Sequence, residues 1–549
     1  MKEQTMKTSR LLIRGAIVAA LGGLLFGFDT AVISGATEAL QKEYDLTNFM
    51  LGFTVASALI GTILGAIIIK FPANSLGRVP TMIIIAVLYF VSAVGTGCPW
   101  DWYSFLFFRF IGGIGVGGAS VVSPLYTAEI SPAKLRGRLV AITQLNIVFG
   151  ILLAYVSNLG IASIGLPEWL TWRLMFAVEA VPAALFFILL FTVKESPRWL
   201  MTKGKTEQAR AILEQLGTDT GNVDEEITVI QRAIDAEKQG GNEAFFQHKY
   251  RIPILYAFLI AAFNQLSGIN AILYYAPTVF EITGSSKSAS LFSSVIIGFT
   301  NLVVTVLAML VIDHFGRRKL LFVGSLGYIL SLGIIAGIFF SYGTQFDKIG
   351  AISGVQKEVV KVIRDINTTK TESPSQEQQQ QLEKMFQDSV TALQNGKTSD
   401  TELVQRMQTA QNIIKTGKIH DAVPLIEEAF QIAGKTVPPM TVSIVLGALM
   451  LFIAAHAFGQ GAIIWVFIGE IFPNRVRAQG QAFGSFTHWV FCAAISWSFP
   501  PLLEKIGGAG VFAFYSGMMV LQLLWVIFVM PETKQISLEE MQKKLGIEE

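Results

Sequence analysis

The sequence predicts an all-α membrane protein with twelve transmembrane helices in two pseudo-symmetric six-helix halves. Composition, a series of long apolar runs and an internal repeat support this prediction. Hydrophobic residues make up 52% of the 549 residues, charged residues only 15%, and the mean hydropathy is +0.52. Soluble chains carry about a quarter charged residues. The net charge of +2 gives no reason to expect a nucleic acid or another polyanion as partner.

Apolar runs of about 20 residues, long enough to cross about 30 Å of hydrocarbon, recur along the chain. The expected spans are residues 11–35, 50–71, 80–98, 104–127, 139–161, 172–193, 253–281, 289–312, 319–342, 440–469, 479–502 and 508–530. The first run follows Lys2, Lys7, Arg10 and Arg14, as the apolar core of a signal peptide would. It is too long for one and lacks a small-residue cleavage site, so we expect a retained helix.

The short loops give the expected orientation. Basic residues gather in alternate loops, at Arg78, Lys134, Arg136, Arg138, Arg317, Arg318, Lys319, Arg475 and Arg477. The remaining loops have little positive excess. Because positive loops stay in the cytoplasm, we expect both termini there, in a multi-pass protein of the cell inner (plasma) membrane.

Two polar stretches interrupt the apolar pattern, and they set the expected domain boundaries. Residues 199–252 follow span six and should form cytoplasmic linker helices. Residues 343–438 follow span nine on the outside and should form either a small helical cap or a partly disordered loop. The remaining units are an N-terminal half at 1–198, a C-terminal half in two parts at 253–342 and 439–530, and a cytoplasmic tail at 531–549.

The same short motifs follow corresponding spans in the two halves. The Gly77-Arg78 pair after span two recurs as Gly316-Arg317 after span eight. A Glu-Ile-x-Pro motif follows span four and span ten, beginning at residues 129 and 470. The distance between copies grows between spans eight and ten, where the insertion lies. Two repeated halves joined by a linker are typical of secondary transporters, with the solute site between the halves.

Longer motifs with this order and spacing are more specific. They occupy residues 22–35, 124–132, 195–200, 265–270 and 531–534. Together they resemble the sugar porter family of the major facilitator superfamily, in particular the bacterial D-xylose:proton symporters. The resemblance covers nearly all of the chain except 343–438. It implies alternating-access symport of a proton with a monosaccharide, either D-xylose or a related pentose or hexose. We expect a monomer in the bilayer that uses no cofactor and no metal.

Asp29 and Arg109 are charges inside predicted spans one and four. A charged side chain in the membrane is costly unless it meets a partner or a wet cavity, and such residues are commonly functional. We expect the two to pair, with protonation of Asp29 releasing the pair and changing the helix packing. The resemblance supports this role in proton coupling. The alternative is a static ion pair that only stabilises the fold.

A sugar presents neighbouring hydroxyls, which amide side chains recognise because they carry a donor and an acceptor side by side. Amides occur inside several apolar runs, and the resemblance matches some of them, with nearby aromatic residues, to sugar-binding positions. The candidates are Gln144, Asn264, Gln265, Asn270, Asn301, Trp465, Tyr275, Phe26, His488 and Trp489. The alternative is that the amides only join helices, and that the aromatic residues only pack.

The sequence departs from the family in several places, among them Ser75 and Val79, which thin the usual basic motif after span two. Asn264 stands where Gln is usual, and His488 stands where relatives carry Gln or Asn. Span ten has Gln460, Ala462 and Ile464 where relatives often place prolines, so its hinge should be weak. These changes leave the identity of the sugar open.

Charged residues after spans two, four, six, eight and ten resemble the salt-bridge network that closes the cytoplasmic gate in this family. They are Arg78, Glu129, Arg136, Glu195, Arg198, Arg317, Glu470 and Arg477. The network should join the halves in the outward-facing state and break when the site opens inward. The alternative is a set of solvated surface charges.

Other functions fit less well. Residues 113–118 satisfy a dinucleotide-binding pattern, but they lie inside span four and should be a small-residue helix contact. No P-loop or nucleophile elbow is present, so we do not expect an enzyme. A sugar uniporter and, less well supported, a non-transporting sugar sensor are the alternatives to a symporter.

Overall fold

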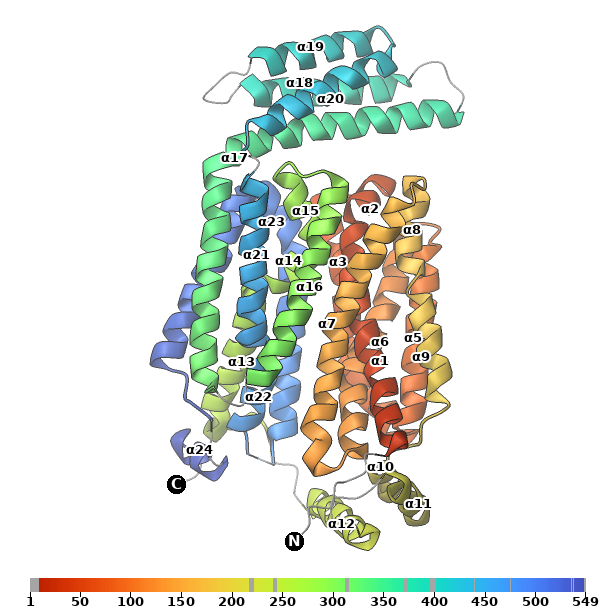
Figure 1. Cartoon of the computed structure of the whole chain (residues 1–549), viewed down its shortest axis with the longest axis vertical. Coiled ribbons are helices and arrows are strands. Elements are labelled where there is room, and N and C mark those ends of the chain that lie inside the picture. The colour runs from red at the N-terminus through yellow and green to blue at the C-terminus, as the bar shows by residue number, and fades with distance from the viewer. Residues whose placement is uncertain are drawn as a thin grey trace.

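The computed structural model describes residues 9–216, 222–239, 244–311, 315–369, 374–394, 401–438, 440–473, 475–534, 536 and 538–547. These residues form helices and turns, with no strand among them. Two helical bundles stand side by side, and a layer of helices crosses one end (Figure 1). The last residue of predicted span eight, and parts of the linker and the insertion, lie outside the described ranges.

The N-terminal half contains the first six spans. They are α1 (Arg10–Val32), α3 (Asn48–Ile68), α5 (Arg78–Gly97), α6 (Trp102–Ile130), α7 (Ala133–Ser163) and the broken pair α8 (Glu168–Ala177) and α9 (Ala180–Leu190). Short elements follow α1 and α3, namely η1 (Ile33–Gly35), α2 (Thr37–Glu43) and α4 (Lys70–Ser75). The linker forms α10 (Pro197–Thr202), α11 (Thr206–Leu216) and α12 (Val223–Gln239) at the end opposite the crossing layer (Figure 1).

The C-terminal half repeats the arrangement with more breaks. Span seven begins after η2 (His248–Tyr250) and consists of α13 (Arg251–Leu266), α14 (Ile269–Tyr274) and α15 (Ala276–Ile282). Spans eight to twelve are α16 (Lys287–Val311), the first part of α17 (Arg317–Thr369), α21 (Met440–Phe458) with α22 (Gln460–Ile471), and α23 (Arg477–Phe528). A short helix, α24 (Leu538–Lys544), follows α23.

Helix α23 supplies two spans. At Gly507 its backbone has φ 66° and ψ 173°, which is not helical. The described residues contain eleven helices long and apolar enough to cross a membrane, and α23 counts once among them. The predicted fold of twelve transmembrane helices in two halves is therefore confirmed.

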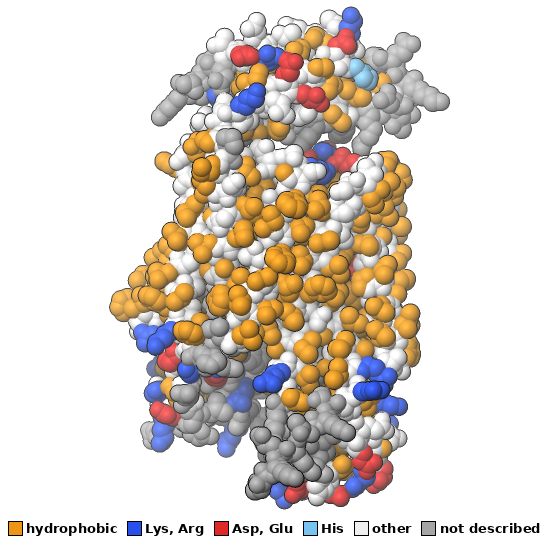
Figure 2. Space-filling view, viewed as in Figure 1, with side chains coloured by type: hydrophobic (Ala, Val, Ile, Leu, Met, Phe, Trp, Pro, Cys, Tyr) orange, Lys and Arg blue, Asp and Glu red, His pale blue; other side chains and the backbone are white. Residues whose placement is uncertain are grey.

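The surface agrees with a position in lipid. On the face shown in Figure 2, a broad belt of hydrophobic side chains covers the bundles, and charged side chains gather at the two ends of this belt. Phe107, Val181, Leu310 and Phe340 belong to this apolar surface and are 58–83% exposed. Lipid, rather than water, is the solvent in which such a surface is stable.

The described part of the insertion is a helical cap rather than a disordered loop. Helix α17 continues through the predicted boundary at residue 343, then turns to cross the end of the bundles (Figure 1). It packs with α18 (Gln376–Gln394) and α20 (Ile419–Lys435), and α19 (Thr401–Lys415) packs on those two helices. Leu382, Phe386, Met407 and Ile426 are fully buried between them. The cap therefore has an apolar core, which is continuous with that of the C-terminal half.

The glycine pattern in α6 is a helix contact, as predicted. A Cβ atom on Gly113 would lie 1.9 Å from the carbonyl oxygen of Ala58, and one on Gly117 would lie 2.2 Å from that of Thr62. Both carbonyls belong to α3. The two backbones therefore touch where the pattern G-x-G-x-x-G occurs, leaving no space for a dinucleotide.

Replacing Gly113 with alanine should destabilise the protein by about 1–3 kcal/mol, because the new methyl group meets backbone that cannot rotate away. Gly160→Ala in α7 is the matched control, since no atom lies within 4 Å of its added Cβ. Thermal unfolding in detergent measures both. Equal midpoints for the two variants would contradict the close α3–α6 contact.

Candidate functional site

A buried ion pair lies in the N-terminal half. Asp29 of α1 and Arg109 of α6 are 3% and 2% exposed, and one guanidinium nitrogen lies 2.6 Å from Asp29 Oδ1. The guanidinium also lies 5.7 Å from the ring centroid of Phe176. The structure therefore brings together the two charges that the sequence predicted to pair.

A second carboxyl group belongs to this site, and the sequence analysis missed it. Glu179 lies at the break between α8 and α9, is 2% exposed, and interacts electrostatically with Asp29 and Arg109. Its Oε1 and the Arg109 Nε have no hydrogen-bond partner among the described residues. Arg109 thus pairs directly with Asp29, and a second buried carboxyl group lies near enough to affect both charges. The sequence could have indicated Glu179, because it is an acidic residue inside predicted span six.

A hydrogen-bonded amide cluster lies in the C-terminal half. The Nε2 atom of Gln265 donates to Asn264 Oδ1 over 2.9 Å, and its Oε1 atom accepts from Asn270 Nδ2 over 2.8 Å. The same Nε2 lies 3.3 and 3.2 Å from the ring nitrogens of His488 in α23. Four predicted residues from α13, α14 and α23 therefore form one cluster.

Aromatic rings extend this cluster toward the other half. The ring centroids of Trp465 and His488 are 5.3 Å apart, and those of His488 and Trp489 are 5.0 Å apart. Trp489 in turn lies 5.6 Å from Phe26 of α1. Trp465 is 36% exposed, which leaves its indole able to cover an apolar face of a ligand.

Three candidates lie apart from the amide cluster. Gln144 is exposed on α7, and no hydrogen bond joins it to the cluster within the described residues. Asn301 on α16 accepts from Thr305 at 3.4 Å. Tyr275 is buried, donates to the Ser496 carbonyl at 3.2 Å and stacks on another ring. In this structure Asn301 and Tyr275 thus have other hydrogen-bond partners, and Gln144 is exposed.

Span ten is broken despite its missing prolines. Gly459, between α21 and α22, has φ −91° and ψ −103°, and an added Cβ would lie 3.1 Å from the Gly324 Cα. The buried Gln460 side chain donates to Gln522, and Gln522 donates to Ser325 Oγ over 3.1 Å. A close glycine contact and buried amides therefore hold a break in this span, where the sequence predicted a weak hinge.

The predicted cytoplasmic gate residues pair inside each half in this structure. Arg78 binds Glu129 through two nitrogens, both at 2.8 Å, and Glu195 accepts the Arg78 backbone N–H at 3.0 Å. In the C-terminal half, Arg317 lies 2.9 Å from Glu470, and Glu532 accepts its backbone N–H at 2.9 Å. The motif repeat seen in the sequence is thus also a repeat of contacts.

The remaining gate candidates lie at the same end. Arg136 donates to the Ala128 carbonyl at 3.1 Å, and Arg477 donates to the Phe472 carbonyl at 3.4 Å. Arg198 lies on α10. Burial raises the pKa of Glu195, and its hydrogen bonds from backbone N–H groups partly oppose that rise. Its carboxylate caps the start of α5.

Polar contacts between the halves lie at the cap end. Lys287 of α16 lies 3.1 Å from Glu168 and 3.8 Å from Glu38, both in the N-terminal half. Asn48 donates to Glu504 at 2.9 Å. The halves are therefore joined at the end near the cap, whereas the gate pairs above stay within their own halves.

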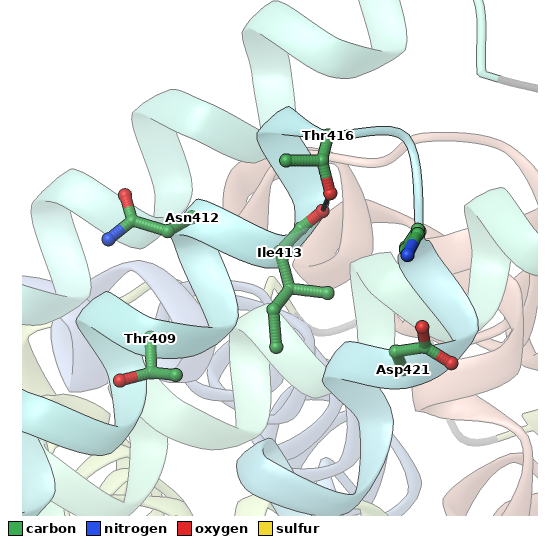
Figure 3. A pocket seen from close by; sticks show the side chains of 6 residues that line it. Thr409, Asn412, Ile413, Thr416 and Asp421 are labelled. Atoms are coloured by element: carbon green, nitrogen blue, oxygen red, sulfur yellow. Dashed lines mark hydrogen bonds between the residues drawn. The ribbon is translucent and has the colours of Figure 1, made fainter.

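A separate depression of about 430 Å³ lies on the cap, between α19 and α20 (Figure 3). Thr409, Asn412 and Asp421 line it, and Thr416 donates to the Ile413 carbonyl at 2.7 Å. It contains none of the residues that the sequence singled out. We therefore do not assign the solute site to it.

The chain has close relatives among known proteins. A model of the family described as sugar (and other) transporter matches residues 15–356 and 430–545, leaving out most of the insertion. The D-xylose-proton symporter of Escherichia coli K12 is 33% identical, over 98% of this chain and 96% of the relative. The glucose transport protein of Synechocystis is 33% identical, over 97% and 96%. The inward-open structure of the xylose transporter XylE from E. coli is 30% identical and superposes with a TM-score of 0.71, over 97% of this chain and 99% of that one.

Proposed function

Because the chain belongs to the sugar porter family of the major facilitator superfamily, we propose that it carries a monosaccharide together with a proton by alternating access. It is a multi-pass membrane transporter and not an enzyme. The observation that carries the proposal is the combination of a buried ion pair in one half with an amide and aromatic cluster in the other.

The proposed sugar site lies between the halves, at the amide cluster. Gln265, Asn270 and His488 supply hydrogen-bonding groups, and Trp465 supplies an apolar surface for the sugar ring. Gln144, exposed on α7 of the N-terminal half, would reach the sugar only if the halves move closer together. This mixture of uncharged bifunctional groups and one indole suits a neutral polyhydroxylated ring better than an ion. D-xylose is the first candidate, since a D-xylose-proton symporter is among the relatives.

The proposed coupling site is the Asp29–Arg109 pair, with Glu179 beside it. Protonation of Asp29 would cancel its attraction to Arg109 and allow α1 and α6 to repack. Glu179 would then remain as a partner for the guanidinium, so that Arg109 is not left alone in the membrane. A proton gradient could in this way drive the conformational cycle.

We propose that the structure represents an inward-facing state. In the plasma membrane, both termini would lie on the cytoplasmic side. The contacts of Lys287, Asn48 and their partners join the halves at the cap end, which would be the outer side. The gate arginines pair within their own halves, as expected of an open cytoplasmic gate. The superposition on an inward-open relative supports the same state.

Transport assays in proteoliposomes test the function. Labelled D-xylose should accumulate inside when an inward proton gradient is imposed, and addition of the sugar to energised cells should alkalinise the medium. Unlabelled glucose, galactose, arabinose and inositol in competition would rank the substrates. Sugar equilibration without accumulation or proton movement would leave a uniporter, and sugar binding without transport would leave a sensor.

Deleting residues 357–429 and joining α17 to α20 with a Gly/Ser linker should leave sugar transport largely intact. This segment lies outside both matched ranges of the family and contains no candidate site residue. Residues 343–356 stay, because Phe346 and Ile349 pack on the C-terminal half. Sugar binding and uptake are measured after the variant is shown to reach the membrane. A correctly inserted variant that cannot bind sugar would make the cap part of the site.

A further inference from the structure

A groove of about 380 Å³ lies on the outside of the N-terminal half, between the start of α1 and the end of α9. Two arginines and four apolar side chains line it: Arg10, Arg14, Ile13, Ile17, Val18 and Leu189. Ile13 and Ile17 are 42% and 52% exposed, whereas Val18 is buried. Helix α1 begins at the end of the bundles opposite the cap (Figure 1). The groove therefore joins a charged part at the start of α1 to an apolar part deeper in the membrane.

The two arginines present their charge on one side of α1. They are four residues apart, so their side chains lie on the same face of the helix, and both are exposed. Within the described ranges, neither guanidinium group has a hydrogen bond or an ion pair. Arg14 does interact electrostatically with Tyr126, which carries no charge near neutral pH. The described part of the protein thus supplies no anion to balance this pair of charges.

Other arginines at the same end of the bundles are balanced within the protein. Arg78 lies 2.8 Å from Glu129, and Arg317 lies 2.9 Å from Glu470. Positive charge at this end therefore does not in itself explain why Arg10 and Arg14 face an apolar groove. A ligand that is anionic at one end and apolar along its length would fit both parts of the groove.

We infer that the groove binds one anionic phospholipid, with the headgroup phosphate between Arg10 and Arg14 and an acyl chain along Ile13, Ile17 and Leu189. A guanidinium group binds phosphate oxygens through charge-assisted hydrogen bonds. Ile17 lies about 10 Å deeper along α1 than Arg10, at 1.5 Å per residue, so the apolar part begins where the chains of a lipid begin. In the proposed orientation this lipid belongs to the cytoplasmic leaflet, and its binding requires neither the sugar site nor Asp29.

The start of α1 is held in place, which favours binding of one lipid at a fixed position. The Ser9 hydroxyl accepts the Leu11 N–H at 3.2 Å and donates to the Gln215 carbonyl of α11. Helix α9 forms the other wall and packs on α1. The lipid therefore meets groups that are already positioned, so less ordering opposes its binding than at a loose helix end.

Native mass spectrometry of the full-length protein in detergent, titrated with dioleoyl phosphatidylglycerol, tests this inference. The first lipid should bind at least about tenfold more tightly than dioleoyl phosphatidylcholine, whose choline cation opposes the arginines. Arg10→Gln combined with Arg14→Gln should weaken binding of the first phosphatidylglycerol about 30-fold, because each basic residue contributes about fivefold. Thermal midpoints show whether the variant is folded, and Arg14→Gln alone, with a loss of about fivefold, replaces it if it is not.

A second variant tests the apolar part of the groove. Ile17→Trp keeps both arginines but places a large ring in the path of the acyl chain, so it should weaken binding of the first phosphatidylglycerol about tenfold. Val181→Trp is its control, because Val181 is also on α9's lipid-facing surface, 69% exposed, and does not line the groove. Lys415→Gln combined with Lys435→Gln is the control for charge, since it removes two positive charges from the cap. Both controls should leave the affinity for the first lipid unchanged.

Three results would overturn the inference. Equal affinity for the two phospholipids would mean that the groove does not select an anionic headgroup. Unchanged affinity in the folded double arginine variant would place the bound lipid elsewhere. A loss in the arginine variant but not in Ile17→Trp, together with competition by millimolar inorganic phosphate, would mean a phosphate site without an acyl chain.

Discussion

Replacing Asp29 with asparagine should abolish sugar accumulation driven by a proton gradient, while sugar exchange across the membrane largely persists. Asparagine has nearly the same shape as aspartate but cannot ionise, so it imitates the protonated residue at every pH. If Asp29 is the coupling acid, return of the empty carrier requires its deprotonation and renewed pairing with Arg109 across 2.6 Å. Asparagine cannot provide that step. Exchange and equilibrium binding need no proton release.

The presence of Glu179 changes what we expect if Asp29 is only a structural counter-ion. If Asp29 only balanced the charge of Arg109, the guanidinium would still interact with Glu179 after the substitution. Uptake would then continue with its original pH dependence. A static pair whose loss damages the fold would instead lower binding, exchange and accumulation together.

Counterflow and gradient-driven uptake in the same proteoliposome preparation distinguish these cases. Asp347→Asn is the matched control, because it makes the same chemical change at an exposed position on α17. That variant should behave as the original protein. Accumulation retained in Asp29→Asn would rule out Asp29 as the coupling acid and leave a uniporter or another coupling residue.

Replacing Gln265 with alanine should weaken sugar binding by about 1–3 kcal/mol, which is about 5- to 150-fold in affinity. The substitution removes the amide that connects Asn264, Asn270 and His488. The sugar hydroxyls and the remaining amides would then be left with unpaired groups in a buried site. Such unpaired groups are costly because water cannot replace the lost partner.

Trp465→Ala should also weaken binding, for a different reason. Its indole packs beside His488 and is 36% exposed, so it offers apolar surface to one face of a sugar ring. Calorimetry in detergent measures both variants against the original protein. Unchanged affinity in the two of them would place the sugar site away from α13 and α22.

The sequence alone was sufficient to predict the spans and one of the charged pairs. Hydrocarbon thickness sets the length of an apolar run, so the positions of the spans follow from hydropathy. Asp29 and Arg109 stood out because an unpaired charge inside such a run is costly. The sequence also showed the repeated motifs, whereas the pairs Arg78–Glu129 and Arg317–Glu470 within each half, in place of the expected network between the halves, come from the structure.

Only the tertiary structure showed the site features that depend on helix breaks and on packing between segments far apart in the sequence. Glu179 reaches the Asp29–Arg109 pair from the break between α8 and α9, and hydropathy does not register such a break. Gln265 and His488 are 223 residues apart in sequence, and only the packing of α13 on α23 brings them together. The contacts that join the two halves near the cap also come from the tertiary structure. A carrier must adopt more than one arrangement of its halves, so its sequence alone does not decide which arrangement is present.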